Sequence, residues 1–504
     1  MEIWSNIILG FQHVLQPMNF LYCFGGVLVG TLIGVLPGIG PVATMSMLFP
    51  FTMGASPLAS IIMLAGVYYG AMYGGSTTSI LVNIPGEAAS VVTCLDGYQM
   101  AKKGQAGPAL GISALGSFIG GTFSIIALMF LVLPLSRISI RFGPPEYLGF
   151  ITMGMTMVIY LSGRSVLKGM IMAILGLILG CVGTDLVSGK IRFVYGISLF
   201  YDGIDMAPMV MGLFGISEVL INIGSSIDRE VFRTRVKNLL PNLQDWKRSI
   251  FPVFRGAVLG FLLGLIPGGG AILASFISYT TEKRISKHPE EFGKGAIEGV
   301  AGPETANNAA VGGAFIPLFA LGIPSNVVMV ILLASFMVHG VAPGPGFIAK
   351  NPVLFWGIIA SMYLGNIMLV ILNLPLIGIW VKILKIPYKI LFPLILFFCV
   401  IGAYSINNRT FDILVMIVFG LFGYFLKKLD FEAAPLALAF VLGPMFELSF
   451  RQTMIIASHN VYFIFTRPVA LIAISLSILL LISSLFRSFW TLRKTVVEDG
   501  ILED

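Results

Sequence analysis

The sequence predicts an all-α polytopic membrane protein, built from two homologous repeats with broken helices or re-entrant hairpins and roughly 11–13 membrane segments. Three observations predict this class. Of the 504 residues, 57% are hydrophobic and 11% are charged, whereas an ordinary soluble domain is about 25% charged. Apolar runs long enough to cross a bilayer recur along the chain. A glycine-rich motif occurs twice.

Composition excludes several other classes. The 31 Lys and Arg exceed the 24 Asp and Glu, for a net charge of +7. These basic residues lie in short connections, as in cytoplasmic loops of membrane proteins, so we expect no nucleic-acid partner. The four cysteines and four histidines are scattered, so neither a disulfide framework nor a metal cluster is expected. No phosphate-binding glycine loop is present, and we do not expect the chain to hydrolyse ATP.

The apolar runs divide into two series. Pro or Gly interrupts several of them, so we expect half-helices among the spans. The first twenty residues lack a basic region and a cleavage site, and are expected to remain as an interfacial helix. The runs are Phe20–Leu36, Pro57–Val82, Pro108–Leu133, Tyr147–Leu161, Val166–Cys181, Met206–Ile223, Phe251–Ile266, Asn308–Val338, Pro352–Ile383, Leu391–Tyr404, Asp412–Leu426, Ala433–Phe446 and Val469–Phe486.

Three sequence matches in the same order indicate an internal duplication. GVLVGTLIGVLPG at 26–38 matches GAVLGFLLGLIPG at 256–268, with an offset of 230. NIPG at 83–86 parallels GIPS at 322–325, with an offset of 239. DMAP at 205–208 parallels EAAP at 432–435, with an offset of 227. The predicted parts are a first membrane repeat at 1–227, a basic cytoplasmic linker at 228–249, a second membrane repeat at 250–465, and a final transmembrane helix with a polar tail at 466–504.

The relative orientation of the repeats rests on their loop charges. The loop 282–294 is basic, whereas its counterpart near 51–59 is uncharged, which favours inversion. Arg137 and Arg141 have basic counterparts near Lys385, which favours the same side. Inverted repeats are common in secondary transporters, and we favour that orientation.

The Pro-Gly that ends each glycine stripe predicts a helix break. Glycines four residues apart are explained by close helix packing. Broken backbone at membrane depth persists only where protein or a water-filled cavity satisfies it. Equivalent breaks in both repeats therefore predict a binding site near the midplane. The residues of the two breaks are Pro37, Gly38, Gly40, Pro267, Gly268, Gly269 and Gly270.

A polar segment follows each break, at 74–87 in the first repeat and at 302–308 and 322–326 in the second. Interhelical hydrogen bonding accounts for a single Ser or Thr, but equivalent clusters in both repeats favour contact with a ligand. Helix N-termini, hydroxyls and amides suit carboxylates, while Ser, Thr and Asn oxygens suit Na⁺. The candidate substrate-binding residues are Ser76, Thr77, Thr78, Asn83, Thr305, Asn307, Asn308, Ser325 and Asn326.

The charges in these segments predict coupling to a cation. Two helix ends supply only about +1, and the polar segments contain no Lys or Arg. Each negative charge moved against the membrane potential costs about 2.3 kcal/mol per 100 mV. We therefore expect Na⁺ or H⁺ as a coupling ion and no other cofactor. The leading candidates for the ion site are Glu87, Glu304 and Ser79, followed by Asp185, Asp205, Glu218, Glu432 and Glu447.

Four motifs resemble the large membrane subunit of the tripartite tricarboxylate transporters. They are GVLPGIGP at 34–41, GGSTTSILVNIPGE at 74–87, GLIPGGGA at 264–271 and GPETANNAA at 302–310. The resemblance runs from about residue 15 to 470. The family's paired Pro-Gly motifs fall on Pro37, Gly38, Pro267 and Gly268.

The resemblance implies a secondary carrier of the bacterial inner membrane. Such a carrier imports tricarboxylates or dicarboxylates such as citrate, by symport with Na⁺ or H⁺. It takes its substrate from a periplasmic solute-binding protein and works with a small membrane subunit of about four helices. Lipid surrounds the chain.

Other functional classes remain open at this point. A stand-alone cation-coupled organic-anion symporter would need no binding protein. A passive channel would neither saturate nor require a cation gradient. An intramembrane enzyme could use Asp185 and Asp205 as a facing pair, but neither has a catalytic context. We do not expect an enzyme.

The positions of two asparagines beside the breaks generate a first prediction. We expect Asn83→Ala and Asn308→Ala each to reduce transport strongly while the protein still inserts and folds. Substrate affinity and Na⁺ dependence of uptake are the measurements. Unchanged values in both variants would remove these residues from the site.

Overall fold

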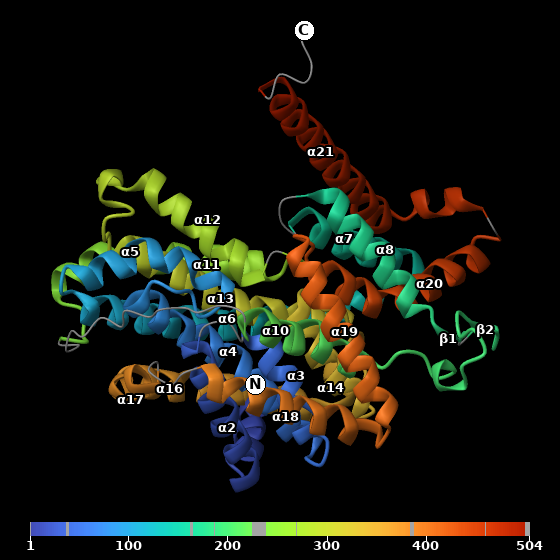
Figure 1. Ribbon diagram of the computed structural model, residues 1–504, viewed down its shortest axis with the longest axis horizontal. Helices are drawn as coiled ribbons and strands as arrows, with labels where there is room; N and C mark the ends of the chain where they lie inside the picture. The colour runs from blue at the N-terminus through green and yellow to red at the C-terminus, as the bar shows by residue number, and fades with distance from the viewer. Residues whose placement is uncertain are drawn as a thin grey trace. The chain divides into compact units, whose positions relative to one another are not determined.

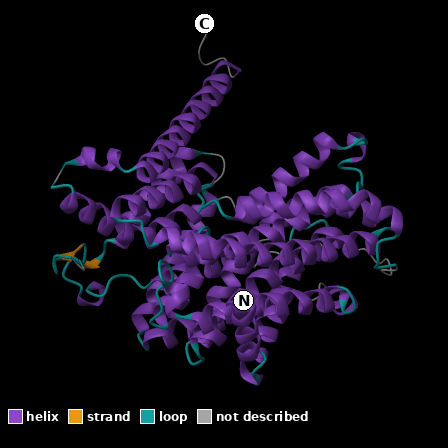
Figure 2. Cartoon of the chain, turned by 180° about the vertical axis from the view of Figure 1, so that it is seen from behind, coloured by secondary structure: helices purple, strands orange, loops and turns teal. Residues whose placement is uncertain are grey.

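A computed structural model describes residues 2–36, 40–161, 165–185, 187–223, 238–268, 270–383, 388–458 and 460–498. Pro37, Gly38 and Gly269 therefore lie outside the described residues, as do 228–237 of the predicted linker. In the described part the chain is almost wholly helical (Figure 1; Figure 2). Its only strands there are β1 (Gly183–Thr184) and β2 (Ile191–Arg192), a short antiparallel pair.

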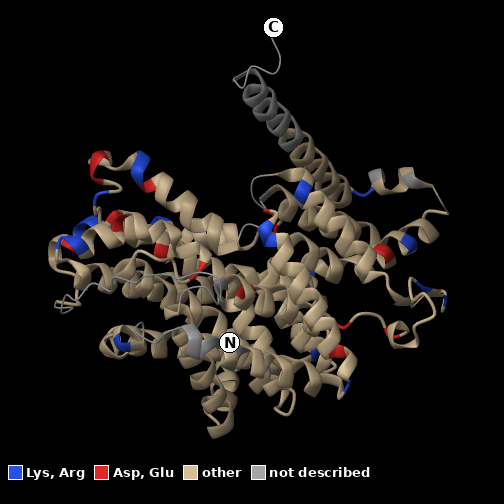
Figure 3. Cartoon of the chain, viewed as in Figure 1, with Lys and Arg blue, Asp and Glu red and all other residues tan. Residues whose placement is uncertain are grey.

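The all-α polytopic membrane prediction is confirmed. Charged side chains are sparse (Figure 3), and 6 helices are long and apolar enough to cross a membrane. These are α2 (Pro17–Val35), α4 (Pro57–Val82), α6 (Ala106–Ser139), α16 (Pro352–Asn373), α19 (Thr410–Lys428) and α20 (Ala434–Ile456).

The chain forms two compact units, and each draws on both predicted repeats. The first comprises Met1–Ile140 and Ala207–Tyr424, and the second comprises Arg141–Met206 and Phe425–Asp504. Besides the helices above, the first unit contains α1 (Glu2–Val14), α3 (Gly40–Thr52), η1 (Ala88–Ser90), α5 (Val91–Lys102), α9 (Met206–Val210), η3 (Met211–Ile216), α10 (Ser217–Ile223), α11 (Leu243–Gly264), α12 (Gly270–Ile285), η4 (Pro289–Glu291), α13 (Glu298–Leu321), α14 (Val327–Val338), α15 (Phe347–Lys350), α17 (Ile377–Ile383) and α18 (Tyr388–Asn407). The second contains α7 (Pro144–Leu161), α8 (Val166–Gly180), η2 (Ser198–Phe200), η5 (Val461–Thr466) and α21 (Pro468–Glu498).

Two runs predicted as single spans are each divided in the structure. The run Asn308–Val338 forms α13 and α14, because Gly322 ends α13 in the left-handed conformation with φ 72°. The run Pro352–Ile383 forms α16 and α17, and Pro375 lies in the turn between them.

The glycine stripes let two pairs of helices pack closely in the first unit. A Cβ atom added at Gly26, Gly30 or Gly34 of α2 would lie 2.2–2.5 Å from a carbonyl oxygen of α4. One added at the equivalent glycines of α11 would lie 2.2–2.4 Å from a carbonyl oxygen of α13. Only glycine permits such close backbone approach. The successive contacts advance along both helices, so α2 runs parallel to α4 and α11 runs parallel to α13.

The equivalent helices α4 and α13 run in opposite directions. Ser76 of α4 contacts Glu304 of α13. One turn further along α4, Ile80 lies beside Gly97, and so does Val300, one turn back along α13. This antiparallel arrangement is the one that inverted repeats predict.

The close contact between α2 and α4 generates a second prediction. Gly26→Val should destabilise the protein strongly, because its side chain would collide with the Met63 carbonyl oxygen, 2.2 Å from the added Cβ. We expect a loss of about 1–3 kcal/mol or more, since backbone must move. The midpoint of thermal unfolding in detergent measures it.

The adjacent glycine supplies the matched control. Nothing lies within 4 Å of a Cβ atom added at Gly25, so Gly25→Val should leave that midpoint nearly unchanged. An equal fall of the unfolding midpoint in both variants would show that the close contact between α2 and α4 does not stabilise this helix pair.

Candidate functional site

Both predicted helix breaks are present. α2 ends at Val35 and α3 begins at Gly40, while α11 ends at Gly264 and α12 begins at Gly270. Gly40 and Gly270 are equivalent and share positive φ angles of 65° and 52°, which glycine adopts without strain. The preceding residues in the sequence are Ile and Gly, which cannot cap a helix with a side chain. A helix N-terminus without a capping side chain presents its first N–H groups to an anion.

A short hairpin lies against each helix break. The two hairpins are the matching sequences at 83–86 and 322–325. Gly86 packs on the first break, and a Cβ atom added there would lie 2.1 Å from the carbonyl oxygen of Gly34. At its equivalent, Ser325, the backbone carbonyl oxygen accepts a hydrogen bond from the Gly268 N–H at 2.7 Å. At the second break, a backbone hydrogen bond from the protein thus satisfies part of the interrupted backbone, as burial in a membrane requires.

The hairpins also start the next helices in equivalent ways. Asn83 ends α4 in the left-handed conformation with φ 59°, a role that asparagine tolerates. Glu87 caps η1 before α5, and Asn326, its equivalent, caps α14. The side chain of Asn83 is exposed, so the structure gives this predicted ligand a backbone role.

Half-helices from the two repeats pack on one another within the first unit. α3 contacts α14, and α12 contacts both η1 and α5. Asn326 donates to the Tyr68 hydroxyl at 3.3 Å, and its Nδ2 lies 4.0 Å from a Cβ atom added at Gly270. The N-terminus of α12 therefore lies beside polar groups from both repeats.

Glu304 lies at the centre of the buried polar groups. It is 1% exposed and comes from the middle of α13. The Ser76 hydroxyl of α4 donates to its Oε2 at 2.5 Å, and the Thr93 hydroxyl of α5 donates to its Oε1. Three helices thus meet at one carboxylate.

Glu87 is a second buried carboxylate, with 7% of its surface exposed. Its Oε2 accepts the Ala89 N–H at 2.6 Å, and its Oε1 accepts the Asn307 amide at 3.2 Å. The neighbouring Asn308 donates to Ser117 at 2.8 Å and to the Glu304 carbonyl at 3.2 Å. These groups form what we name the carboxylate cluster, which comprises Ser76, Glu87, Thr93, Ser117, Glu304, Asn307 and Asn308.

Among the residues that the structure describes, the carboxylate cluster has no positively charged partner. Neither Glu87 nor Glu304 forms an ion pair with any Lys, Arg or His that the structure describes. In the second unit, by contrast, Asp185 and Glu447 both pair with Arg451. Buried charges normally require pairing, which distinguishes the cluster from Asp185 and Glu447.

The remaining predicted residues donate hydrogen bonds mainly to backbone carbonyl groups. Thr78 donates to the Val35 carbonyl at the end of α2 at 2.7 Å. Ser79 donates to the Gly75 carbonyl and to Ser90. Thr305 donates to the Ala301 carbonyl, and Ser325 to that of Ala314. Thr77 is buried on the same helix as Ser76.

Sequence reasoning missed three residues of the site, Thr93, Ser117 and Tyr68. Thr93 and Ser117 lie on α5 and α6, outside the predicted polar segments, and Tyr68 lies on α4 before the segment at 74–87; a lone hydroxyl commonly serves helix packing. The only available signal was their burial in helices that flank the motif segments, which the sequence does not report.

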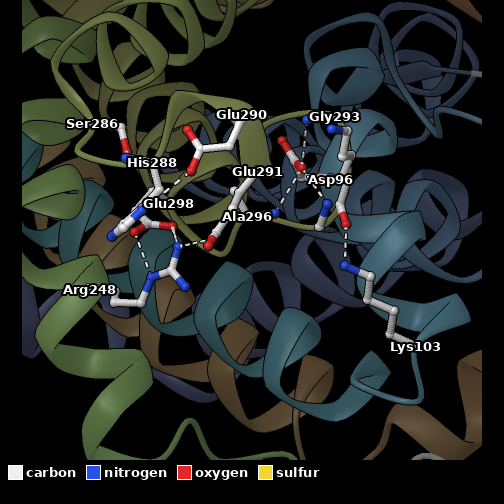
Figure 4. Close-up of polar contacts among 12 residues, drawn as sticks. Asp96, Lys103, Arg248, Ser286, His288, Glu290, Glu291, Gly293, Ala296 and Glu298 are labelled. Atoms are coloured by element: carbon white, nitrogen blue, oxygen red, sulfur yellow. Dashed lines mark hydrogen bonds and ion pairs between the residues drawn. The ribbon is translucent and has the colours of Figure 1, made fainter.

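Another buried carboxylate, outside the carboxylate cluster, anchors the loop before α13. Asp96 of α5 is fully buried and its Oδ1 accepts the N–H groups of Gly293, Gly295 and Ala296 at 2.7–2.8 Å (Figure 4). Its Oδ2 accepts the Tyr279 hydroxyl at 2.9 Å. Every carboxylate oxygen is thus satisfied, and this group ties α5 to the loop.

Arg248 braces the same loop from α11. It donates to Glu298 at 2.7 and 2.9 Å and to Glu291 at 2.6 Å (Figure 4). This hydrogen bond holds the pKa of Glu291 below its usual value. Arg255 pairs in the same way with Glu282 of α12. Arginines of α11 thus pair with glutamates in and beside the loop that the sequence predicts as basic.

The fold and the site together define a multi-pass membrane protein with paired broken helices around buried carboxylates. Residues 20–438 match the Tripartite tricarboxylate transporter TctA family. The chain belongs to this family, and is thus a component of a tricarboxylate transporter. The resemblance seen in the sequence is confirmed.

Two relatives come from Agrobacterium vitis. The uncharacterized 52.8 kDa protein in the TAR-I ttuC' 3' region is 50% identical over 500 residues, which cover 99% of this chain and 100% of the relative. The uncharacterized protein in the TAR-II ttuC' 3' region is 54% identical over 241 residues, 48% of this chain and 100% of the relative. No solved structure matches the chain.

The anchoring role of Asp96 generates a third prediction. Asp96→Ala would leave three backbone N–H groups without their acceptor, so we expect the free energy of unfolding to fall by about 3 kcal/mol or more. Thermal unfolding and proteolysis of the loop 286–296 are the measurements.

Asp245→Ala is the control for this variant. Asp245 accepts a single N–H group, from Asn242 at the start of α11, and its loss should cost only about 1 kcal/mol. A loop that remains protected in Asp96→Ala would contradict the anchoring role.

Proposed function

We propose that this chain is the translocating subunit of a secondary transporter that imports small dicarboxylates or tricarboxylates across the bacterial inner membrane. The observation that carries the proposal is the pair of equivalent helix breaks, each closed by its own hairpin, whose half-helices pack on one another. Discontinuous helices of this kind form substrate sites in secondary transporters. Membership of the family supplies the substrate class. The proposal includes no enzymatic activity.

The substrate's carboxylates would bind at the free N-termini of α3 and α12. Each helix end offers N–H groups and about half a positive charge. Asn326 adds an amide donor beside the N-terminus of α12. Two ends compensate about one negative charge in total, so a substrate with two or three carboxylates needs accompanying cations. Coupling to Na⁺ or H⁺ follows from this charge count.

Two partners complete the proposed transporter. A periplasmic solute-binding protein delivers the substrate, and a small membrane subunit of about four helices accompanies this chain. Family membership supports both partners, because the family is named for a tripartite system. A stand-alone symporter would transport without the binding protein.

Reconstitution of the chain with its small subunit tests the proposal. Proteoliposomes are screened for uptake of dicarboxylates and tricarboxylates with imposed Na⁺ or H⁺ gradients, with and without candidate binding proteins. We expect saturable uptake that requires a cation gradient and the binding protein. Uptake without the binding protein would favour the stand-alone symporter, and non-saturable flux would indicate a channel.

The place of Asn326 generates a fourth prediction. Asp caps a helix as well as Asn does, so Asn326→Asp should fold normally. Its new negative charge would repel a carboxylate at the N-terminus of α12, so we expect the KM of uptake to rise about tenfold or more. Asn242→Asp, at the exposed N-cap of α11, is the matched control and should leave KM unchanged. An unchanged KM in Asn326→Asp would place the substrate elsewhere.

A further inference from the structure

One face of α13 carries two amide oxygens that have no partner. Glu304, Asn307 and Asn308 are spaced i, i+3 and i+4, so they share this face. Asn307 is 1% exposed and Asn308 is 3% exposed, and both amides donate within the carboxylate cluster. The Oδ1 atom of each has no hydrogen-bond donor. A buried acceptor left unpaired costs about 1–3 kcal/mol, so the two atoms indicate a missing ligand.

The charge of the cluster indicates that this ligand is a cation. Glu87 and Glu304 together carry up to two negative charges, and neither has a basic partner among the described residues. The other titratable groups that face them are Tyr68 and Tyr73 on α4 and Cys94 on α5, and none of these can supply a positive charge.

The identity of the ligand atoms favours Na⁺ over other cations. The available groups are carboxylate, amide and hydroxyl oxygens, which suit a hard cation. Both oxygens of each carboxylate already accept a hydrogen bond, so neutral oxygens must provide much of the coordination. That balance suits a monovalent ion better than Ca²⁺. A proton would neutralise a carboxylate but would leave both Oδ1 atoms without a partner.

We infer that Glu87, Glu304, Asn307 and Asn308 form a Na⁺ site. Glu87 precedes α5 in the first predicted repeat, whereas the other three lie on α13 in the second. The bound ion would therefore join segments from the two repeats. Its role as the coupling ion rests on the proposed transport function, but its binding does not.

Na⁺ binding by the purified full-length protein tests the inference. The midpoint of thermal unfolding is measured as NaCl replaces choline chloride at constant ionic strength, and ²²Na⁺ binding is measured directly. We expect saturable stabilisation by Na⁺ and none by K⁺. Glu304→Gln and Asn308→Ala should each weaken Na⁺ binding about tenfold or more. If Glu304→Gln does not fold, Asn308→Ala alone is decisive, because it keeps both carboxylates.

Asn373→Ala is the matched control. Asn373 on α16 is buried and its Oδ1 also has no partner, but its amide donates to the Leu369 carbonyl and contacts no carboxylate. This variant should bind Na⁺ with wild-type affinity.

Three outcomes would overturn the Na⁺ site. They are equal stabilisation by K⁺ or choline, stabilisation by Ca²⁺ or by acid without ²²Na⁺ binding, and wild-type Na⁺ affinity in Asn308→Ala. Carboxylate uptake is scored separately in proteoliposomes. Intact Na⁺ binding without uptake would overturn the transport proposal alone, whereas uptake without Na⁺ binding would overturn this site alone.

Discussion

Close contact between glycine faces holds the first unit together. Lipid offers no hydrogen bonds to the backbone, so interrupted helices are stable only where neighbouring protein approaches closely enough to satisfy them. The glycines of α2 and α11 bring their backbones against α4 and α13, respectively. This approach places Gly34 against the hairpin at Gly86, and the equivalent hairpin bonds Gly268 through Ser325. The two helix breaks depend on these close contacts between helices.

Each unit also contains a close contact between one helix of the first predicted repeat and one helix of the second. In the second unit, Gly176 of α8 packs on the carbonyl of Leu436 in α20. In the first unit, Gly212 of η3 packs on the carbonyl of Met416 in α19. Gly176 and Gly212 lie in the first predicted repeat, and Met416 and Leu436 lie in the second. Each unit therefore takes one partner from each repeat, as an intertwined pair of repeats would.

The carboxylate cluster lies where segments of the two repeats meet. Glu304 takes its donors from α4 and α5, while Glu87 takes one from α13. Equivalence between the repeats ends here. Glu87 corresponds to Asn326, so one hairpin places a carboxylate at its cap and the other places an amide. The two halves thus present different side chains at matching positions of a similar backbone.

The sequence by itself determined the membrane class and the positions of both breaks. These are local properties, because apolar runs, Pro-Gly pairs and glycine spacing act within a few turns of one helix. The tertiary structure alone decided which polar residues meet. Ser76 and Asn307 were predicted as ligands, but their carboxylate partners, and the contribution of Thr93, depend on the direction in which α4, α5 and α13 pack. It also showed that Asn83 shapes the end of α4. Side-chain pairing between helices that are distant in the sequence has no local signature, because it forms only when all of these helices have packed together.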